Sequence, residues 1–223
     1  MNIKQQLVSN SLANKASFGT GNPKKFITVH QTGNTAKGAN AQTHANLQSR
    51  GYSASWHWQV DDKEAIQSFD HTWRLFHAGD GRGKGNMESI GIESCINSDG
   101  DYVQAVKNTA KLVAKIMKDE NISIDRVVQH NYWSGKNCPA QIRAGQAGIN
   151  WNQFIGLVKG DASGGSTITK PQPEQKPAKK SIDQMAQEVI DNKHGNYPER
   201  KTKLESLGYN YQQVQDRVNE ILS

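Results

Sequence analysis

Residues 129–142, QHNYWSGKNCPAQI, bring His130, Lys136 and Cys138 into one short segment. Histidine and cysteine are the two side chains that best hold a zinc ion. Each residue also has an ordinary interpretation on its own: a structural histidine, a solvated lysine and an inert buried thiol. The segment therefore predicts a metal site only if the rest of the chain supplies the missing ligands.

A second histidine stands in a matching place. FITVH (26–30) and RVVQH (126–130) both have the pattern of a strand, and they end in His30 and His130. Functional groups gather at strand ends in α/β sheets, so the two imidazoles can converge, with Cys138 on a loop long enough to fold back. Three ligands with an open fourth position are typical of a catalytic zinc, one ion per site. His44, His57 and His71 compete as ligands, so spacing alone leaves the set open.

Glu93 lies inside the apolar segment SIGIESC. A carboxylate there is costly unless it has a task or a partner, and the partner could be an arginine such as Arg74 or Arg126. A zinc ion lowers the pKa of bound water, and a carboxylate can deliver that water as a base. Lys136 could stabilise the oxyanion of a tetrahedral intermediate. Together these groups describe the hydrolysis of an acyl bond.

The elements that must position these residues alternate between strands and helices. Strand patterns cover 26–30, 55–62, 64–70, 89–96 and 126–130, with a hairpin around residues 61–63. Helical patterns cover 41–50, 102–120 and 151–158. This order predicts an α/β domain, a mixed central sheet flanked by helices.

Composition changes sharply between residues 160 and 180, where Gly and Ser give way to Pro and Lys. Such a segment has too few apolar groups to join a core and is typical of a linker. We expect a catalytic domain at residues 1–159, a flexible linker at 160–180 and a small domain at 181–223.

The small domain should be a three-helix bundle. Ser181 followed by Gln184 has the pattern of a capping box before the first helix. The second helix is expected to carry Leu204 and Leu207 and to stop at Gly208. The third should begin at Asn210 and bury Val214, Val218, Ile221 and Leu222.

Charge and hydropathy narrow the function classes. The formal net charge is +6, which favours a polyanionic partner such as nucleic acid, an anionic membrane or an anionic cell wall. No run approaches the roughly 20 apolar residues of a membrane span, and the first residues lack the apolar core of a signal peptide. We therefore expect synthesis in the cytoplasm, where Cys95 and Cys138 would stay unpaired.

Five segments resemble one known family: ITVHQTGN, SWHWQVDD, FHAGDG, SIGIESC and HNYWSGKNCPAQI. Their order and spacing are similar to those of the zinc-dependent N-acetylmuramoyl-L-alanine amidases of the type 2 family, in particular phage lysins and related autolysins. The resemblance covers residues 22–158 and implies the fold shared with peptidoglycan recognition proteins. It implies zinc ligands at His30, His130 and Cys138, and catalytic roles for Glu93 and Lys136. It also implies a substrate groove lined by His77 and Asn34.

One position departs from a branch of this family, which includes the animal peptidoglycan recognition proteins. That branch has a catalytic tyrosine where this chain has Trp56. An indole cannot act as an acid or a base, so more of the proton transfer should fall on Glu93. Non-catalytic members of the branch lose the cysteine ligand, which this chain keeps as Cys138.

Residues 186–221 resemble the short cell-wall-binding repeat found in tandem in a phage lysozyme. The resemblance implies a ligand contact at Arg200. It also implies one at His194, where the repeat usually has a tryptophan. The alternative is a helical domain that only dimerises or packs against the catalytic part.

The expected function is that of a phage endolysin. It would hydrolyse the bond between N-acetylmuramic acid and L-alanine in bacterial peptidoglycan, and it would act on the wall after release from the host cytoplasm. Anionic wall polymers are further expected partners, whereas nucleic acid and membrane insertion are not, since Lys and Arg are dispersed. The alternative is a peptidoglycan-recognition protein that binds without cutting.

Overall fold

The computed structural model describes residues 1–160, 181–190 and 199–222. The chain divides into two compact units, residues 1–165 and 166–223. Apart from Gly160, the linker predicted at residues 160–180 lies outside the described residues.

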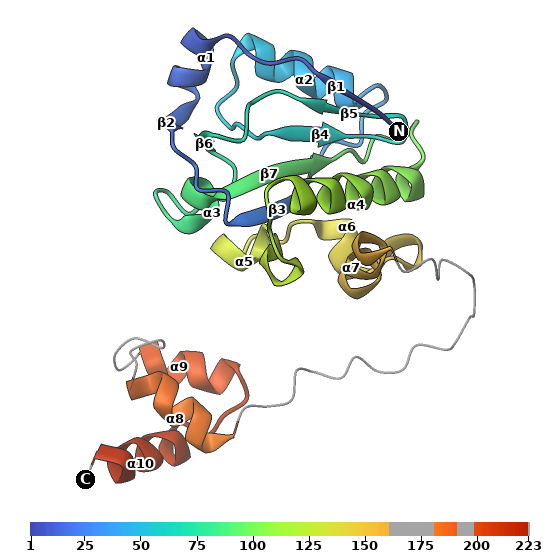
Figure 1. Cartoon of the computed structure of the whole chain (residues 1–223). Coiled ribbons are helices and arrows are strands. Elements are labelled where there is room, and N and C mark those ends of the chain that lie inside the picture. Colours follow the sequence, from blue (N-terminus) through green and yellow to red (C-terminus); the bar gives the residue numbers. More distant parts are fainter. Residues whose placement is uncertain (161–180, 191–198, 223) are drawn as a thin grey trace. The chain divides into compact units, whose positions relative to one another are not determined.

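A six-stranded sheet forms the centre of the first unit, with the order β1-β5-β4-β7-β3-β8 (Figure 1). The pairs β1/β5, β4/β7, β7/β3 and β3/β8 are parallel, and the β4/β5 hairpin is antiparallel. The strands are β1 (Asn2–Gln5), β3 (Phe26–Gln31), β4 (Trp58–Val60), β5 (Glu64–Gln67), β7 (Ser89–Ser94) and β8 (Val127–Gln129). Helices flank this mixed sheet, so the predicted fold class is confirmed.

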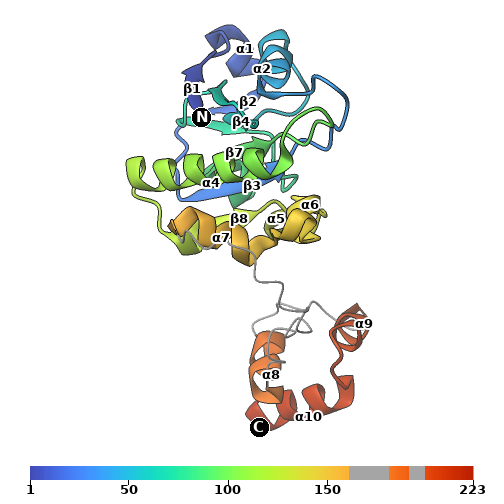
Figure 2. The same cartoon turned by 90° about the vertical axis from the view of Figure 1, so that its right-hand side faces the viewer.

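The helices that cover the sheet are those with the clearest sequence periodicity. Helix α4 (Tyr102–Asp119) begins at Asp101, whose carboxylate accepts the backbone N–H of Gln104. Helix α7 (Trp151–Lys159) begins with a capping box between Asn150 and Gln153. Both pack on one face of the sheet, and Figure 2 shows α4 crossing in front of β3 and β7. Helix α2 (Ala41–Arg50) packs on the opposite face.

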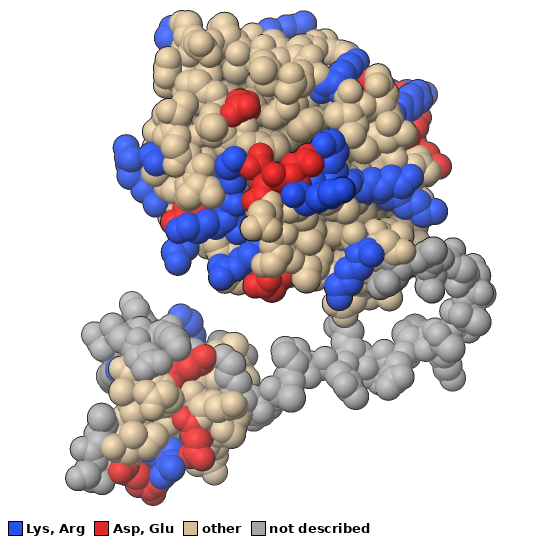
Figure 3. Space-filling view, in the orientation of Figure 1, with Lys and Arg blue, Asp and Glu red and all other residues tan. Residues whose placement is uncertain are grey.

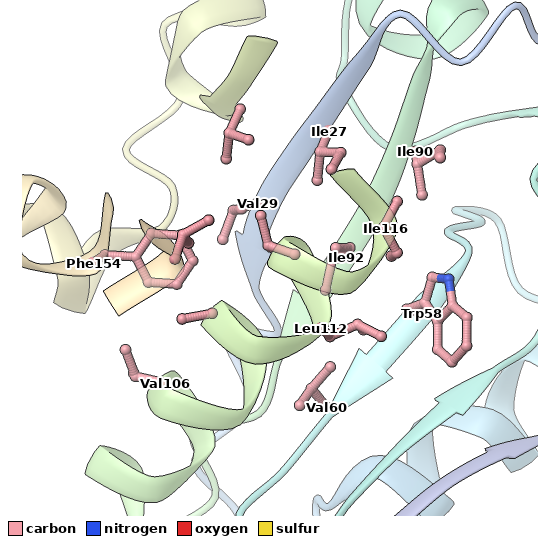
Figure 4. Close-up of a cluster of buried hydrophobic side chains, with 14 of the residues drawn as sticks. Ile27, Val29, Trp58, Val60, Ile90, Ile92, Val106, Leu112, Ile116 and Phe154 are labelled. Atoms are coloured by element: carbon pink, nitrogen blue, oxygen red, sulfur yellow. The ribbon is translucent and has the colours of Figure 1, made fainter. Parts of the chain in front are cut away.

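Alternation along the central strands separates an apolar face from a polar one. The side chains that meet α4 and α7 form the main core (Figure 4), and those from the two central strands are Ile27, Val29, Ile90 and Ile92. Successive side chains of a strand point to opposite faces. The residues between them, Thr28, His30, Gly91 and Glu93, therefore share the other face. The polar face is where the candidate chemistry lies.

Several short elements have no clear sequence pattern. Strands β2 (Ser17–Thr20) and β6 (Trp73–Leu75) form a separate antiparallel pair. The short helices are α1 (Asn10–Lys15), α3 (Lys84–Glu88), α5 (Asn131–Ser134) and α6 (Ala140–Arg143). The strand predicted at 126–130 is shorter than expected. Arg126 belongs to a 3-10 turn, and His130 has helical backbone angles at the start of α5.

The second unit contains α8 (Ile182–Ile190), α9 (Glu199–Ser206) and α10 (Tyr211–Leu222). The capping box predicted at Ser181 forms, since Ser181 and Gln184 exchange hydrogen bonds between side chain and backbone. Asn210 accepts the N–H of Gln213, as expected of the residue that begins α10. The buried cluster is Met185, Ala186, Val189, Leu204, Tyr209, Val214 and Val218.

The inward position predicted for Ile221 is wrong, since its side chain is 40% exposed. Leu207, the last apolar residue before Gly208, is 51% exposed. Leu207 follows the end of α9, and Ile221 lies in the last turn of α10, where neighbouring helices no longer cover it. The core is completed instead by Tyr209, which lies between the two helices. Among the described residues, no helix has the length and apolar character needed to cross a membrane.

Candidate metal centre and catalytic carboxylate

His30 and His130 meet where two neighbouring parallel strands end. β3 pairs with β8, and the backbone N–H of His130 donates to the carbonyl of Val29 (3.2 Å). The Nδ1 atoms of the two imidazoles are 2.9 Å apart, and both rings are buried. The convergence expected from the matching strand ends is therefore present.

Cys138 reaches the same point from a loop that folds back. The backbone N–H of Asn131 donates to the carbonyl of Cys138 (3.0 Å), which closes the loop between α5 and α6. The backbone N–H of Gln31, next to His30, lies 3.5 Å from the Cys138 Sγ. Ligand atoms of His30, His130 and Cys138 all lie within 4.8 Å of one another.

This donor set fits a zinc ion. Tetrahedral zinc with bonds of about 2.0–2.3 Å holds its ligand atoms roughly 3.3–3.6 Å apart, within the range seen here. Burial is the largest cause that lowers the pKa of His30 well below its usual value, and the nearby His77, His130 and Lys136 lower it further. The ring is therefore neutral and has a lone pair to offer. Burial raises the pKa of Cys138 to about 11, and a cation would displace that thiol proton.

Glu93 lies beside the three candidate ligands. It is the direct partner of His30 in the β3/β7 pairing, and its Oε1 is 4.0 Å from the His30 Nδ1. Its Oε2 is buried and has no hydrogen-bond partner among the described residues. Burial raises the pKa of Glu93 to about 8, against the lowering effect of Lys136. A carboxyl group with a pKa near neutrality is suited to proton transfer.

The alternative role for Glu93, an ion pair with a buried arginine, is wrong. Arg74 donates to the carbonyl of Gly21 (2.8 Å). Arg126 pairs with Asp125 and lies over the ring of Phe26. The buried carboxylate therefore needs another explanation.

Lys136 is exposed on the loop between α5 and α6. The side-chain amide of Asn131 donates to the carbonyls of Gly135 and Lys136 (2.8 and 2.9 Å), which holds the loop in place. The charge of Lys136 lowers the pKa of both Glu93 and Cys138, so the ammonium group acts on the site.

A cavity of about 450 Å³ contains all these groups. Asn34 and His77 also line it. Asn34 is exposed, and its side-chain oxygen accepts the N–H of Ala36 (3.1 Å). His77 is buried, with Nδ1 3.0 Å from the Nε2 of His30. Their roles as substrate contacts stay predictions.

Gln31 and Tyr52 are among the lining residues that were not predicted from the sequence. The side-chain oxygen of Gln31 accepts the N–H of Gln141 (2.9 Å) and so holds the start of α6 beside Cys138. Its place directly after His30 in HQTGN is the one signal that could have suggested this role. Tyr52 is about half exposed, and its ring lies 6.2 Å from that of Trp56, whose indole N–H is bound to Gln59. Aromatic residues in a loop give no local sequence signal that they will line a cavity.

The competing histidines have other partners. His57 accepts the N–H of Gly91 at Nδ1 (3.0 Å), and its Nε2 faces the carbonyl of Trp73 (3.1 Å). His71 bonds Trp58 and Glu120. The Nδ1 of His44 is bound to the carbonyl of Asn40. None of the three belongs to the ligand cluster found in the described part of the chain.

The predicted contacts of the second unit are less fully described. Arg200 lies at the start of α9 and donates to the side chain of Gln215 on α10 (3.4 Å). His194 lies outside the described residues. Both assignments stay predictions.

Residues 20–141 match the family model described as N-acetylmuramoyl-L-alanine amidase, more than half of the chain. The chain belongs to this amidase family. Residues 183–222 match the model described as the CW_7 repeat, in agreement with the second resemblance. The candidate ligands and Glu93 all fall inside the first match.

Individual relatives agree with this assignment. The N-acetylmuramoyl-L-alanine amidase CwlH of Bacillus subtilis (strain 168) is 42% identical over 155 residues, 69% of this chain and 59% of that protein. The solved catalytic domain of XlyA is 39% identical, with a TM-score of 0.65, over 71% of this chain and 99% of that one. A structure titled "Mutant endolysin from Bacillus subtilis" is 41% identical, with a TM-score of 0.66, over the same shares of the two chains. The chain spans about half the length of the curated relatives it matches.

Proposed function

We propose that this chain is a zinc-dependent amidase that hydrolyses the bond between N-acetylmuramic acid and L-alanine in peptidoglycan. The observation that carries the proposal is the meeting of His30, His130 and Cys138 in one cavity beside Glu93, whose Oε2 is buried. Membership of the amidase family supports the choice of bond. One zinc ion held by the three ligands would supply a Lewis acid and an acidified water.

Glu93 supplies the proton transfers. Its carboxylate takes a proton from the water that attacks the lactyl carbonyl, as a new C–O bond forms. The same group then gives that proton to the nitrogen of L-alanine as the C–N bond breaks. The products are a lactyl carboxylate and a free alanine amine. The absence of other hydrogen-bond partners for Oε2 among the described residues leaves that oxygen available for this task.

Lys136 stabilises the negative charge that develops on the carbonyl oxygen. It stands at the rim of the cavity, and its charge already acts on Glu93 and Cys138. In a site partly closed to water, an ammonium group facing an oxyanion is worth more than in solution. Asn34 and His77 line the same cavity, which supports the proposal that they lie beside the bound substrate.

The second unit would hold the enzyme on the wall. Its match to the CW_7 repeat supports a muropeptide as ligand, with Arg200 and His194 as contacts. Replacing Arg200 with Gln in an inactive background should reduce the fraction of protein that sediments with intact walls. Equal sedimentation by the folded variant would remove Arg200 from the contact.

Anionic wall polymers are a further proposed partner. Residues 181–223 carry five Lys or Arg against seven Asp or Glu, so the positive charge resides in residues 1–180. On the face shown in Figure 3, Lys and Arg are interspersed with Asp and Glu. In the first unit some basic side chains are paired with acidic ones, such as Lys115 with Asp119 and Lys25 with Glu88. Attraction to a polyanion would therefore be diffuse and sensitive to salt.

We also propose that the chain acts as a phage endolysin on the bacterial wall, supported by the endolysin title of one similar structure. The test is to incubate the full chain with purified walls and to measure new amino groups and new reducing ends. New N-terminal alanine without reducing ends supports the amidase. Reducing ends would indicate a glycosidase, and binding without either product would indicate a recognition protein.

The Glu93→Gln variant tests the proton transfer. It should bind zinc as the wild type does, while turnover falls about 10²–10⁴-fold. The matched control is Glu88→Gln, just before the same strand, where the carboxylate pairs with Lys25 at the surface. Wild-type turnover in Glu93→Gln would remove this residue from the mechanism.

A further inference from the structure

A chain of hydrogen bonds runs behind His30, on the polar face of the sheet. The indole Nε1 of Trp133 lies 2.9 Å from Thr28 Oγ1, which is 2.8 Å from Ser89 Oγ. Ser89 Oγ is 2.5 Å from the carbonyl of Gly85 and 3.5 Å from the Nε2 of His77. The Nδ1 of His77 then lies 3.0 Å from the Nε2 of His30.

At the two ends of this series of hydrogen bonds, the donor and acceptor roles are fixed. An indole N–H can only donate, and a carbonyl oxygen can only accept. The proton between Ser89 and Gly85 must therefore belong to the Ser89 hydroxyl, which has no other proton to give. Because the Ser89 proton is used by Gly85, Ser89 can only accept from Thr28, so the Thr28 hydroxyl donates to Ser89 and accepts the indole N–H of Trp133.

The direction of the remaining bonds follows. With its proton committed to Gly85, Ser89 Oγ can only accept from His77, so His77 carries its proton on Nε2. Its Nδ1 is then a lone pair, and the proton shared with His30 must come from the His30 Nε2. His30 is left with a bare Nδ1, which is the nitrogen that faces His130 at 2.9 Å.

We infer that His77 is a positioning residue, which fixes His30 in the tautomer that presents Nδ1 to the metal, through an oriented hydrogen-bond chain anchored at Trp133 and Gly85. Partners that hold the second nitrogen of a metal-binding histidine set its tautomer and orientation. Here the partner is itself a histidine, His77, and its own tautomer is set by the hydroxyl of Ser89 on β7. The inference rests on the metal site of the proposed function.

The surroundings of His77 agree with a fixed ring. A Cβ placed on Gly91 would lie 2.9 Å from the Cγ of His77 and 3.0 Å from two further ring atoms, so the ring lies directly on β7 where a side chain is missing. The side-chain oxygen of Asn86 accepts the backbone N–H groups of His77 and Ala78 (2.9 and 2.7 Å). The ring is buried, and each of its two nitrogens faces one hydrogen-bond partner, His30 at Nδ1 and Ser89 at Nε2.

The first test reads the tautomers directly in the zinc-free, full-length wild type. Nitrogen-15 NMR of the histidine rings distinguishes a protonated Nε2 from a protonated Nδ1. We expect the Nε2–H form for both His30 and His77. A protonated Nδ1 on either ring would overturn the inference. This measurement needs neither zinc nor activity, so it is independent of whether the proposed amidase reaction occurs.

The second test compares two substitutions by zinc affinity, measured by competition with a chelator. His77→Leu removes the acceptor, and we expect zinc to bind about 10–100-fold more weakly. His77→Asn attaches an oxygen acceptor to Cγ, where the ring has Nδ1, and should recover most of the loss. If His77 only filled space, the leucine variant would bind zinc at least as well as the asparagine variant, which would overturn the inference.

A control separates this effect from the general cost of losing a buried histidine. His71→Leu makes the same change at a ring that bonds Trp58 and Glu120, away from the chain of hydrogen bonds. Zinc affinity should stay at the wild-type value. If His71→Leu weakens zinc as much as His77→Leu does, the positioning role is contradicted. If His77→Leu fails to fold, the tautomers of the wild type decide.

Discussion

The contact between Gly91 and His77 allows a quantitative test of how the site is supported. In Gly91→Ala, the new Cβ would stand 2.9 Å from the ring, whereas ordinary contacts begin at 3.4 Å. The ring must therefore shift by roughly 0.5 Å. Overpacking of this kind costs about 1–3 kcal/mol. For a unit of this size it corresponds to a loss of about 2–12 °C in Tm.

The assay is a double-mutant cycle on thermal unfolding of the zinc-free protein. All five tryptophans lie in residues 1–165, so their fluorescence reports the first unit. His77→Ala removes the ring, and in that background Gly91→Ala should cost close to nothing. An equal cost in both backgrounds would refute the reasoning, because it would place the strain elsewhere on β7.

Two further predictions concern the candidate metal site, and a third concerns the stability provided by Glu120. Cys138→Ser should weaken zinc binding by at least an order of magnitude in chelator competition, because a hydroxyl is a much poorer ligand than a thiolate; unchanged affinity would exclude Cys138 as a ligand. Lys136→Ala should lower kcat on purified walls more than it raises KM, since the ammonium acts on the transition state; a change in KM alone would confine it to binding. Despite the raising effect of burial, hydrogen bonds from Lys24 and His71 lower the pKa of Glu120 below 4.5. The Glu120 carboxylate should therefore add to the free energy of unfolding. This contribution is complete above pH 4.5 and is lost as the pH falls through the lowered pKa of the folded state. The Tm difference between wild type and Glu120→Gln should shrink on acidification, and a constant difference would contradict this.

Periodicity predicted the helices and strands that are long enough for their apolar pattern to repeat. Helix α4 has five turns, so its apolar stripe is unambiguous, and the β4/β5 hairpin has strands on both sides of a polar turn. β1 is an edge strand with a single apolar residue, Ile3, and it is held by side-chain bonds such as Lys4 to Gln42. Contacts of that kind depend on residues far away in the chain, so no local pattern reveals them.

The same limit applies to the candidate site. His30 and His130 could be paired from sequence because each ends a strand, and strand ends meet in a parallel sheet. The bond between His30 and His77 joins residues 47 positions apart through a loop, and nothing in FHAGDG indicates which way the ring turns. In the second unit, helical spacing placed Ile221 on the inward face of its helix but could not show where that face stops being covered.

The central claim is that the full chain cleaves the amide bond with zinc held by His30, His130 and Cys138. The most direct measurement is the release of N-terminal alanine from purified walls by protein stripped of metal and then titrated with zinc. We expect no release without metal and full activity at one zinc per chain. Release of alanine by the metal-free protein, or no release at any zinc content, would contradict it.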